Sequence, residues 1–234
     1  MKEIIEFRDV TKAYGSGKHR LFAADHLNFT INEGEFVVIL GPSGAGKSTL
    51  LNLLGGMDQA TSGQIIVKGK NIVGLNDNKL TEYRAANVGF VFQFYNLIPT
   101  LTAFENVALA KSIVKDSLNT EEVLKSVGLG DHINQFPSQM SGGEQQRVSI
   151  ARAISKNPTM LLCDEPTGAL DSETGVVILT LLQKMSHEKN KTVIIVTHNA
   201  ALAQAADKVI RIKNGKIKEV FINETPLAVS EVNW

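Results

Sequence analysis

Residues 41–49 read GPSGAGKST, and they directly follow the apolar run Phe36–Leu40. A short buried strand, a glycine-rich turn and a helical pattern over Lys47–Leu54 form the context of a Walker A phosphate-binding loop. The glycines let the backbone wrap so that successive N–H groups point at phosphate oxygens. The helix that follows directs its positive N-terminal end at the same anion. The stretch therefore predicts that the chain binds a nucleoside triphosphate.

Every residue of this loop is a candidate nucleotide contact: Gly41, Pro42, Ser43, Gly44, Ala45, Gly46, Lys47, Ser48 and Thr49. The Lys47 side chain can reach the β- and γ-phosphates, and the Ser48 hydroxyl can ligate Mg²⁺. A glycine-rich turn that binds nothing is the alternative, and the complete pattern after a strand disfavours it.

The composition restricts the classes of protein that fit. The 234 residues suit one large domain, and 43% hydrophobic with 21% charged residues is ordinary for a globular protein. The 24 basic and 24 acidic residues cancel, which gives no electrostatic reason to expect a nucleic-acid partner. Cys163 is the single cysteine, so no intrachain disulfide can form. Because we find no secretory signal and no membrane-spanning run, we expect a cytosolic domain.

Strand-like and helical patterns alternate along most of the chain, which predicts an α/β core with parallel strands. The strands before Phe36, and a hairpin at Asn214-Gly215, are expected to be antiparallel. Strand-like runs vanish between Gln93 and Ser141, so a helical insert is expected there, and the segment after Asn223 is expected to be loosely held. The single domain, 1–234, is thus divided into an α/β core with an antiparallel part (1–93 and 158–222), a helical subdomain (94–157) and a tail (223–234).

Acidic residues after a second apolar run predict a metal site. Met160–Cys163 is followed by Asp164, which is the Walker B form, and a carboxylate at this strand end would hold Mg²⁺. Glu165 comes next and is well placed to orient or deprotonate an attacking water. A solvated acidic pair is the alternative.

Two more polar residues follow predicted strands. His198 comes after the run Thr192–Val196, where it can contact the γ-phosphate and help to hold the water. Gln93 ends the run Val88–Phe92 and offers an amide oxygen to metal or water. A lone histidine is more often structural, but its place at a strand end favours function.

A second anion site is predicted at residues 141–147, SGGEQQR, where a helix begins. Ser141 is a good N-cap, and Gly142 and Gly143 expose backbone N–H groups at the helix N-terminus. One chain with one Walker A loop needs only one cradle for a γ-phosphate. The economical explanation is that this site binds the phosphate held by a second copy, which predicts an ATP-driven head-to-tail dimer.

The order of these motifs resembles that of the ATP-binding-cassette (ABC) ATPases over nearly the whole chain. The matching motifs are Walker A, the Q-loop Gln93, the signature 141–145, Walker B with Glu165, the D-loop 169–171 and the H-loop His198. The resemblance implies a P-loop NTPase (RecA-like) core with a parallel sheet, an N-terminal antiparallel β subdomain and an inserted α-helical subdomain.

The resemblance also implies roles for the site residues. ATP would be bound with Lys47 on its β/γ-phosphates and with Tyr14, which lies 27 residues before Gly41, stacked on adenine. A packing tyrosine is the alternative. The family pattern gives Ser48, Gln93 and Asp164 to Mg²⁺; Glu165, His198 and Gln93 to catalysis; and Ser141, Gly142, Gly143 and Asp171 to nucleotide contacts.

Finer features are similar to the MacB, LolD, FtsE and BceA types, which work with a permease that has few membrane helices and a large extracytoplasmic domain. These features are FVFQFYNLIP at 90–99 and DEPTGALDS at 164–172. Met140 and Glu144 depart from the leucine and glutamine that many members carry. The cluster Phe94, Tyr95, Leu97 and Ile98 is expected either to receive the permease or to be core of the helical lobe.

The resemblance implies the ATPase subunit of an exporter, an antimicrobial-peptide resistance complex or a lipoprotein-type complex. It would lie on the cytoplasmic face of the membrane, held by an FtsX- or MacB-type permease, and a periplasmic or extracellular accessory protein could join through the permease. One alternative is an FtsE-like regulator of division hydrolases. Another is a soluble ABC ATPase acting on DNA or ribosomes. DNA-repair members carry long coiled coils between the two halves of the site, whereas this chain has only 48 residues from Gln93 to Ser141, and translation-factor members usually join two cassettes, whereas this chain has one.

Overall fold

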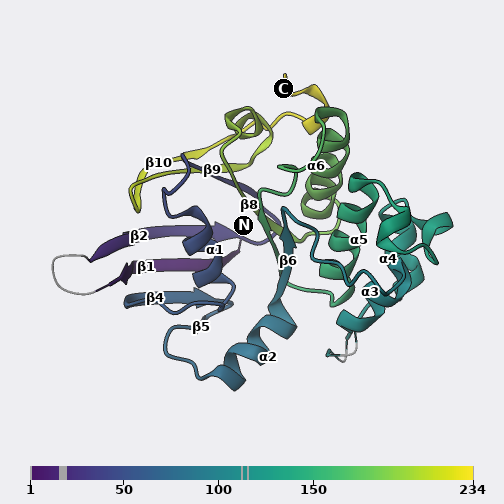
Figure 1. The fold of residues 1–234 in the computed structure, drawn as a ribbon. Helices are drawn as coiled ribbons and strands as arrows, with labels where there is room; N and C mark the ends of the chain where they lie inside the picture. The colour runs from purple at the N-terminus through teal and green to yellow at the C-terminus, as the bar shows by residue number, and fades with distance from the viewer. Residues whose placement is uncertain (1, 16–19, 112, 115, 234) are drawn as a thin grey trace.

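The computed structural model describes residues 2–15, 20–111, 113–114 and 116–233, which form two β-sheets and the helices around them (Figure 1). The remaining residues of the predicted core, helical subdomain and tail lie outside the described part. The first sheet is antiparallel, in the order β2-β1-β4-β5. Its strands are β1 (Glu3–Tyr14), β2 (Leu21–Asn32), β4 (Ser62–Val67) and β5 (Lys70–Asn71).

The second sheet has six strands in the order β10-β9-β3-β8-β7-β6. They are β3 (Phe36–Leu40), β6 (Val88–Phe92), β7 (Met160–Asp164), β8 (Thr192–Thr197), β9 (Lys208–Lys213) and β10 (Lys216–Ile222). All neighbouring pairs are parallel except β9 and β10, which form the hairpin predicted at Asn214-Gly215. The α/β class, the parallel core and the antiparallel N-terminal part are therefore confirmed.

The inner parallel strands β3, β7 and β8 are almost continuously apolar and buried because both of their faces are covered. Val37 and Ile39 face a core shared with α1 and the antiparallel sheet, whereas Phe36, Val38 and Leu40 face a core shared with α5 and α6. Cys163 is fully buried in the second core, as expected for a small core residue.

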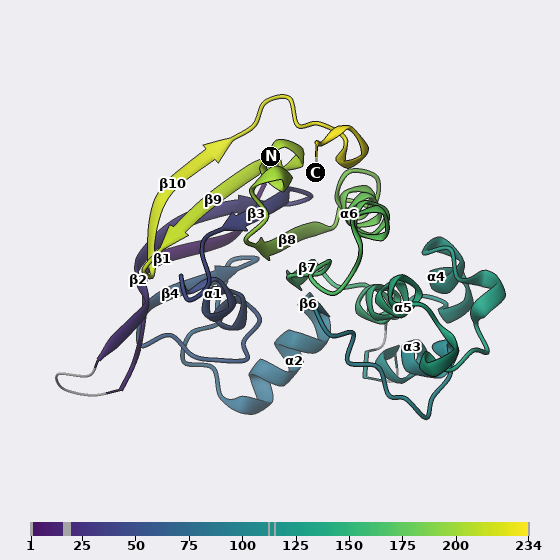
Figure 2. The same ribbon diagram turned by 45° about the horizontal axis from the view of Figure 1, so that its top comes forward.

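Helices surround the six-stranded sheet, and α3, α4 and α5 gather at the end remote from the antiparallel sheet (Figure 2). The helices are α1 (Lys47–Leu54), α2 (Asp77–Asn87), α3 (Ala103–Lys111), α4 (Thr120–Ser126), α5 (Gly142–Ser155) and α6 (Ser172–His187), with short 3₁₀ turns η2 (Gly130–His132), η3 (Pro137–Gln139), η4 (Ala200–Ala205) and η5 (Val229–Glu231). None of those in the described part is long and apolar enough to cross a membrane.

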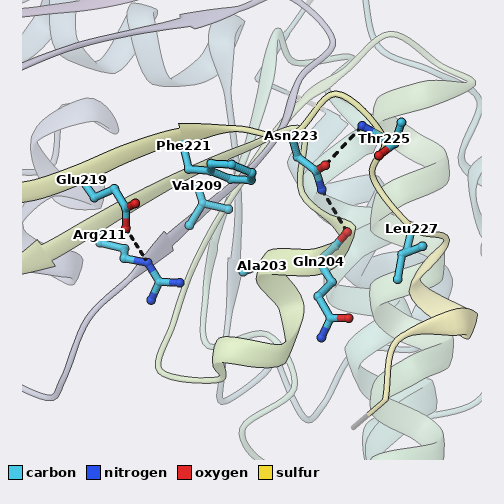
Figure 3. Close-up of a pocket in the computed structure, with 9 residues that line it drawn as sticks. All are labelled: Ala203, Gln204, Val209, Arg211, Glu219, Phe221, Asn223, Thr225 and Leu227. Atoms are coloured by element: carbon cyan, nitrogen blue, oxygen red, sulfur yellow. Dashed lines mark hydrogen bonds and ion pairs between the residues drawn. The ribbon is translucent and has the colours of Figure 1, made fainter.

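The C-terminal tail is packed on the core, so the expectation of a loosely held segment is wrong. Val229 and Val232 are only 0% and 5% exposed, and Gln183 of α6 donates to the Leu227 carbonyl oxygen and accepts from the Val229 N–H. The tail also borders a hollow of about 450 Å³, where Asn223 donates to the Gln204 carbonyl oxygen (Figure 3). Two valines three residues apart are too short a pattern to reveal this packing in the sequence.

A buried ion pair joins the two sheets. Lys208 of β9 and Glu35, in the turn between β2 and β3, are 4% and 6% exposed, with 2.9 Å between Nζ and Oε2. The Lys208 ammonium also donates to the Thr30 carbonyl oxygen, and Asn32 donates to Glu35 from its backbone and its side chain. Both charges are thus fully hydrogen-bonded, which is the condition under which a buried pair is tolerated.

We expect Lys208→Met to lower the free energy of unfolding by about 3–5 kcal/mol, because Glu35 is left as a buried carboxylate without its cation. Urea unfolding measures the change. The control is Lys216→Met, which breaks the 3.2 Å pair with Asp25, and there the loss should stay below about 1 kcal/mol because Lys216 is largely exposed. Equal losses in the two variants would contradict the role given to the buried pair.

Candidate functional site

The loop between β3 and α1 is held tightly by its surroundings. Gly46 has φ +100°, and a Cβ atom there would lie 2.0 Å from the Ala23 carbonyl oxygen. A Cβ atom on Gly41 would lie 2.3 Å from the Ile212 carbonyl oxygen, so only glycine fits either position. No side chain of the described residues caps α1, which leaves its first N–H groups available to an anion.

Lys47 directs its charge into this loop. Its side chain is buried, and Nζ donates to the carbonyl oxygens of Gly41 at 2.8 Å and Pro42 at 3.1 Å. The ammonium is thus held where phosphate oxygens would enter, and the loop backbone and cation together fit a polyphosphate.

Ser48 of α1 lies beside Asp164, the last residue of β7, with 3.4 Å between Ser48 Oγ and Asp164 Oδ1. The pKa of Asp164 is raised from its usual value, chiefly because the carboxyl group is partly buried. The Glu165 charge also raises this pKa, whereas the Ser48 hydrogen bond and the Lys47 charge lower it. A divalent cation would favour the ionised carboxylate. Hydroxyl and carboxylate oxygens are ligands that Mg²⁺ prefers, so this pair fits the predicted metal.

Glu165 is held in a sparsely populated backbone conformation with φ +44°. Such a conformation in a residue other than glycine costs of order 1–3 kcal/mol and persists only where the surroundings enforce it. The Glu165 N–H donates to the Val196 carbonyl oxygen, and its own carbonyl oxygen accepts from the Gly168 N–H, both at 3.0 Å. These two hydrogen bonds hold the strained conformation and so fix the direction in which the Glu165 side chain leaves the backbone.

The Glu165 carboxylate is fixed as well. Thr197 Oγ1 donates to Oε2 at 2.8 Å, and His198 Nδ1 lies 2.9 Å from Oε1. His198 is therefore brought against the candidate base, although most of its side chain is exposed. Together the two neighbours hold a carboxylate that could receive a proton from water.

A cleft of about 490 Å³ brings most of the candidates together. It is lined by Ser43, Gly44, Lys47, Ser48, Phe92, Gln93, Phe94, Asn96, Asp164 and Glu165. The carboxyl ends of parallel strands meet at this edge, which is where ligands bind in open α/β sheets.

Tyr14 is not among the residues that line this cleft. Its hydroxyl donates to Asp58 at 2.7 Å, and the Lys12 ammonium lies 4.8 Å from the ring centroid. Burial raises the pKa of Tyr14, and the hydrogen bond to Asp58 raises it further. Tyr14 is 43% exposed, so part of its surface stays open to solvent.

The second predicted anion site lies apart from the cleft. Ser141 caps α5 and exchanges hydrogen bonds with Glu144, whose pKa is lowered by these bonds from the Ser141 backbone and side chain. Gly143 packs against Thr174, since a Cβ atom there would lie 2.4 Å from its methyl group. Asp171 caps α6 by accepting from the Thr174 N–H. The signature residues and Asp171 are thus neighbours, and none of them lines the phosphate cleft.

The apolar cluster after Gln93 divides into two parts. Phe94 is 72% exposed and Ile98 is 37% exposed, whereas Leu97 packs against the core of the helical part. Tyr95 lies beside the signature segment, because a Cβ atom on Gly142 would be 2.7 Å from its hydroxyl oxygen.

Three residues that contact the site were missed in the sequence. Thr197, Gln146 and Arg152 all bond to segments that carry site residues. Thr197 could have been found, since it precedes His198 at a strand end. Gln146 lies within the predicted segment 141–147, but nothing in the local pattern marks its bridging role or the contacts of Arg152, because their partners lie tens of residues away.

The comparisons with known proteins agree with this geometry. The sequence model of the ABC transporter family matches residues 24–168. The chain is 43% identical over 225 residues to an uncharacterized ABC transporter ATP-binding protein of Thermotoga maritima, covering 94% of this chain and 96% of that protein. It is 44% identical over 224 residues to the ABC transporter ATP-binding protein MJ0796 of Methanocaldococcus jannaschii, covering 92% and 95%.

Two solved structures are similar over nearly all of the fold. The ATP-binding cassette MJ0796, in a dimeric post-hydrolysis state bound to ADP and Pi, has a TM-score of 0.84 at 42% identity and covers 94% of this chain and 98% of its own. CbiO1 from Clostridium perfringens, part of the ABC transporter complex cbiONQ, has a TM-score of 0.84 at 27% identity and covers 94% and 88%. With a phosphate loop, a Ser48–Asp164 pair and a positioned Glu165 on the matching fold, this chain belongs to the ABC transporter family, as an ATP-binding cassette that binds ATP with Mg²⁺ and hydrolyses it.

Proposed function

We propose that the chain is the ATPase subunit of a MacB- or LolD-type ABC transporter and that two copies close head to tail around ATP. The observation that carries this proposal is the separation of the capped α5 N-terminus from the phosphate cleft of the same chain. In a head-to-tail dimer, the signature residues of each copy would face the phosphate cleft of the other copy and complete its site. The dimeric structure of MJ0796 supports this arrangement.

In this proposal the phosphate loop binds and orients ATP. The N–H groups of residues 41–49 and the Lys47 ammonium hold the phosphates, and Tyr14 presents its exposed surface to adenine. Mg²⁺, held by Ser48, Gln93 and Asp164, would neutralise phosphate charge. Ser141, Gly142, Gly143 and Asp171 would contact the nucleotide of the second copy.

Glu165 acts as the base in this proposal. Its carboxylate receives a proton from the attacking water, and Thr197 and His198 keep it from rotating away. His198 senses the γ-phosphate beside it, and Gln93 holds its amide at the same cleft. The groups that Glu165 needs for positioning thus come from the last residue of the adjacent strand β8, Thr197, and from His198 directly after it.

The partner in this proposal is an FtsX- or MacB-type permease, which would keep the chain on the cytoplasmic face of the membrane. Phe94 and Ile98 are exposed apolar residues, and Phe94 directly follows Gln93 and lines the cleft, so binding there can bias the geometry of the cleft. The membership of cbiO1 in a transporter complex supports a permease partner. Export of a peptide or lipoprotein, antibiotic resistance and an extracytoplasmic accessory protein are the finer expectations of this proposal.

We expect Glu165→Gln to lower ATP turnover by a factor of about 10²–10⁴ while ATP binding is retained, because the amide cannot accept the proton but leaves the phosphate loop intact. Phosphate release and nucleotide binding on the purified protein measure both effects. Glu224→Gln, an exposed acid on the tail, is the control and should keep wild-type turnover. Near-normal turnover in Glu165→Gln would assign the base to another group.

Ser141→Arg should prevent the ATP-dependent dimer in a Glu165→Gln background, because a bulky side chain fills the proposed site of the second copy's phosphate. Binding of ATP to the phosphate loop should remain. Asn119→Arg is a matched control, since Asn119 likewise caps a helix, α4, and its loss costs a similar ~1 kcal/mol. Light scattering with and without ATP measures dimer formation. Equal dimerisation of the two variants would contradict the proposal that two copies share each nucleotide site.

Phe94→Glu should abolish co-purification with the permease while the subunit stays folded, because an exposed residue contributes little to the core. Phe221→Glu, at a phenylalanine 51% exposed on β10, is the control and should still co-purify. Circular dichroism checks the fold of each subunit. A folded Phe94→Glu protein that keeps its permease would place the docking surface elsewhere.

A further inference from the structure

Gln146 of α5 bridges two segments of the catalytic edge. Its side chain is fully buried, and Nε2 donates to the Pro166 carbonyl oxygen at 2.7 Å and to the Phe92 carbonyl oxygen at 3.3 Å. Because both partners are acceptors, the amide must present its NH₂ group to them. Phe92 directly precedes Gln93, and Pro166 directly follows Glu165.

The bridge lies at the end of the sheet. Phe92 of β6 and Asp164 of β7 are the last paired residues of the two strands. The ladder between β6 and β7 ends at this pair, so the carbonyl oxygen of the last paired residue, Phe92, and that of Pro166 beyond the strand end are open to other donors. The Gln146 amide supplies a hydrogen-bond donor to both carbonyl oxygens, so it continues the connection between β6 and β7 where the ladder stops.

The same helix holds the other side of the Gln93 segment. Arg152 donates to the Asn96 carbonyl oxygen at 2.6 Å and to the Tyr95 carbonyl oxygen at 2.9 Å. The loop that carries Gln93 is therefore fastened to α5 before and after the glutamine. Since Ser141 caps α5, the signature and this loop are parts of one hydrogen-bonded unit.

We propose that Gln146 is a positioning residue for ATP hydrolysis, which sets Gln93 and Glu165 relative to each other and to the signature helix. The inference rests on the proposed roles of Gln93, Glu165 and the signature. When the α5 N-terminus engages the phosphate of a second copy, a shift of the helix is passed through the Gln146 amide to both segments. Gln146 thus connects the contact with the second copy's nucleotide to the hydrolysis of ATP in the chain's own cleft.

The test is Gln146→Met, which keeps the length and approximate volume of the side chain but removes both donors. Among the described residues, Gln146 Oε1 has no hydrogen-bond partner, so the variant deletes no other bond of this side chain. We expect kcat to fall about 10-fold or more, as for other residues that orient catalytic groups. KM for ATP should stay within about twofold, because the phosphate loop is untouched.

Gln183→Met is the matched control. Gln183 is also a nearly buried helix glutamine whose Nε2 donates to two carbonyl oxygens, those of Ala205 and Leu227, but these lie by the tail. Both variants should lose thermal stability, whereas only Gln146→Met should lose kcat. Equal kcat in the two variants would overturn the proposal, since the effect of Gln146 would then be structural alone.

A double-mutant cycle with Gln93→Ala asks whether Gln146 acts through that residue. We expect the double variant to lose less kcat than the product of the two single losses, and a simple product would overturn the proposal. If Gln146→Met does not fold, Gln146→Asn serves instead. It keeps the buried amide but is too short to reach both carbonyl oxygens, and the same loss of kcat is expected.

The roles on which the inference rests are checked separately. Wild-type turnover in Gln93→Ala or Glu165→Gln would overturn those roles, and the inference with them. Strong losses in both, together with an unchanged kcat in Gln146→Met, would overturn the inference alone.

Discussion

The parallel register of β3, β8, β7 and β6 is the constraint on which the site depends. Leu40 pairs with Thr197, Val196 pairs with Asp164, and Asp164 pairs with Phe92. This row of paired residues marks the strand ends. The phosphate loop, His198, Glu165 and Gln93 each follow directly after a residue of the row. Because parallel strands end at one edge, residues far apart in the chain emerge side by side there. A shift of one residue in the register of any of these strand pairs would turn the side chains of the shifted strand to the opposite face of the sheet.

The antiparallel sheet supports this edge from outside. The Ala23 backbone on β2 touches Gly46, and the buried Lys208–Glu35 pair ties the end of β2 to β9. The phosphate loop is thus enclosed between backbone segments of both sheets. That rigidity matters because electrostatic stabilisation requires donors that are already in place before the reaction.

The candidate base lies at a strained point of the backbone. Glu165 has a left-handed conformation, and Thr197, His198 and the Val196 carbonyl oxygen hold it there. The segment that carries Glu165 and the end of the neighbouring strand β6 are joined to α5 by one buried amide, that of Gln146. A helix that belongs to the proposed dimer contact is thereby connected to the candidate base, which provides a physical route for coupling.

The sequence by itself determined the α/β class, the phosphate loop, the Asp164–Glu165 edge and the α5 cap at Ser141, because each depends on neighbours within a few residues. Tertiary structure alone decided the packed tail, the Tyr14–Asp58 hydrogen bond and the Gln146 bridge. These contacts join residues that lie tens of positions apart, and the side chains involved follow no period of a helix or strand. Only the folded chain brings such donors and acceptors within reach of each other, since burial demands that each polar group find a partner wherever one lies.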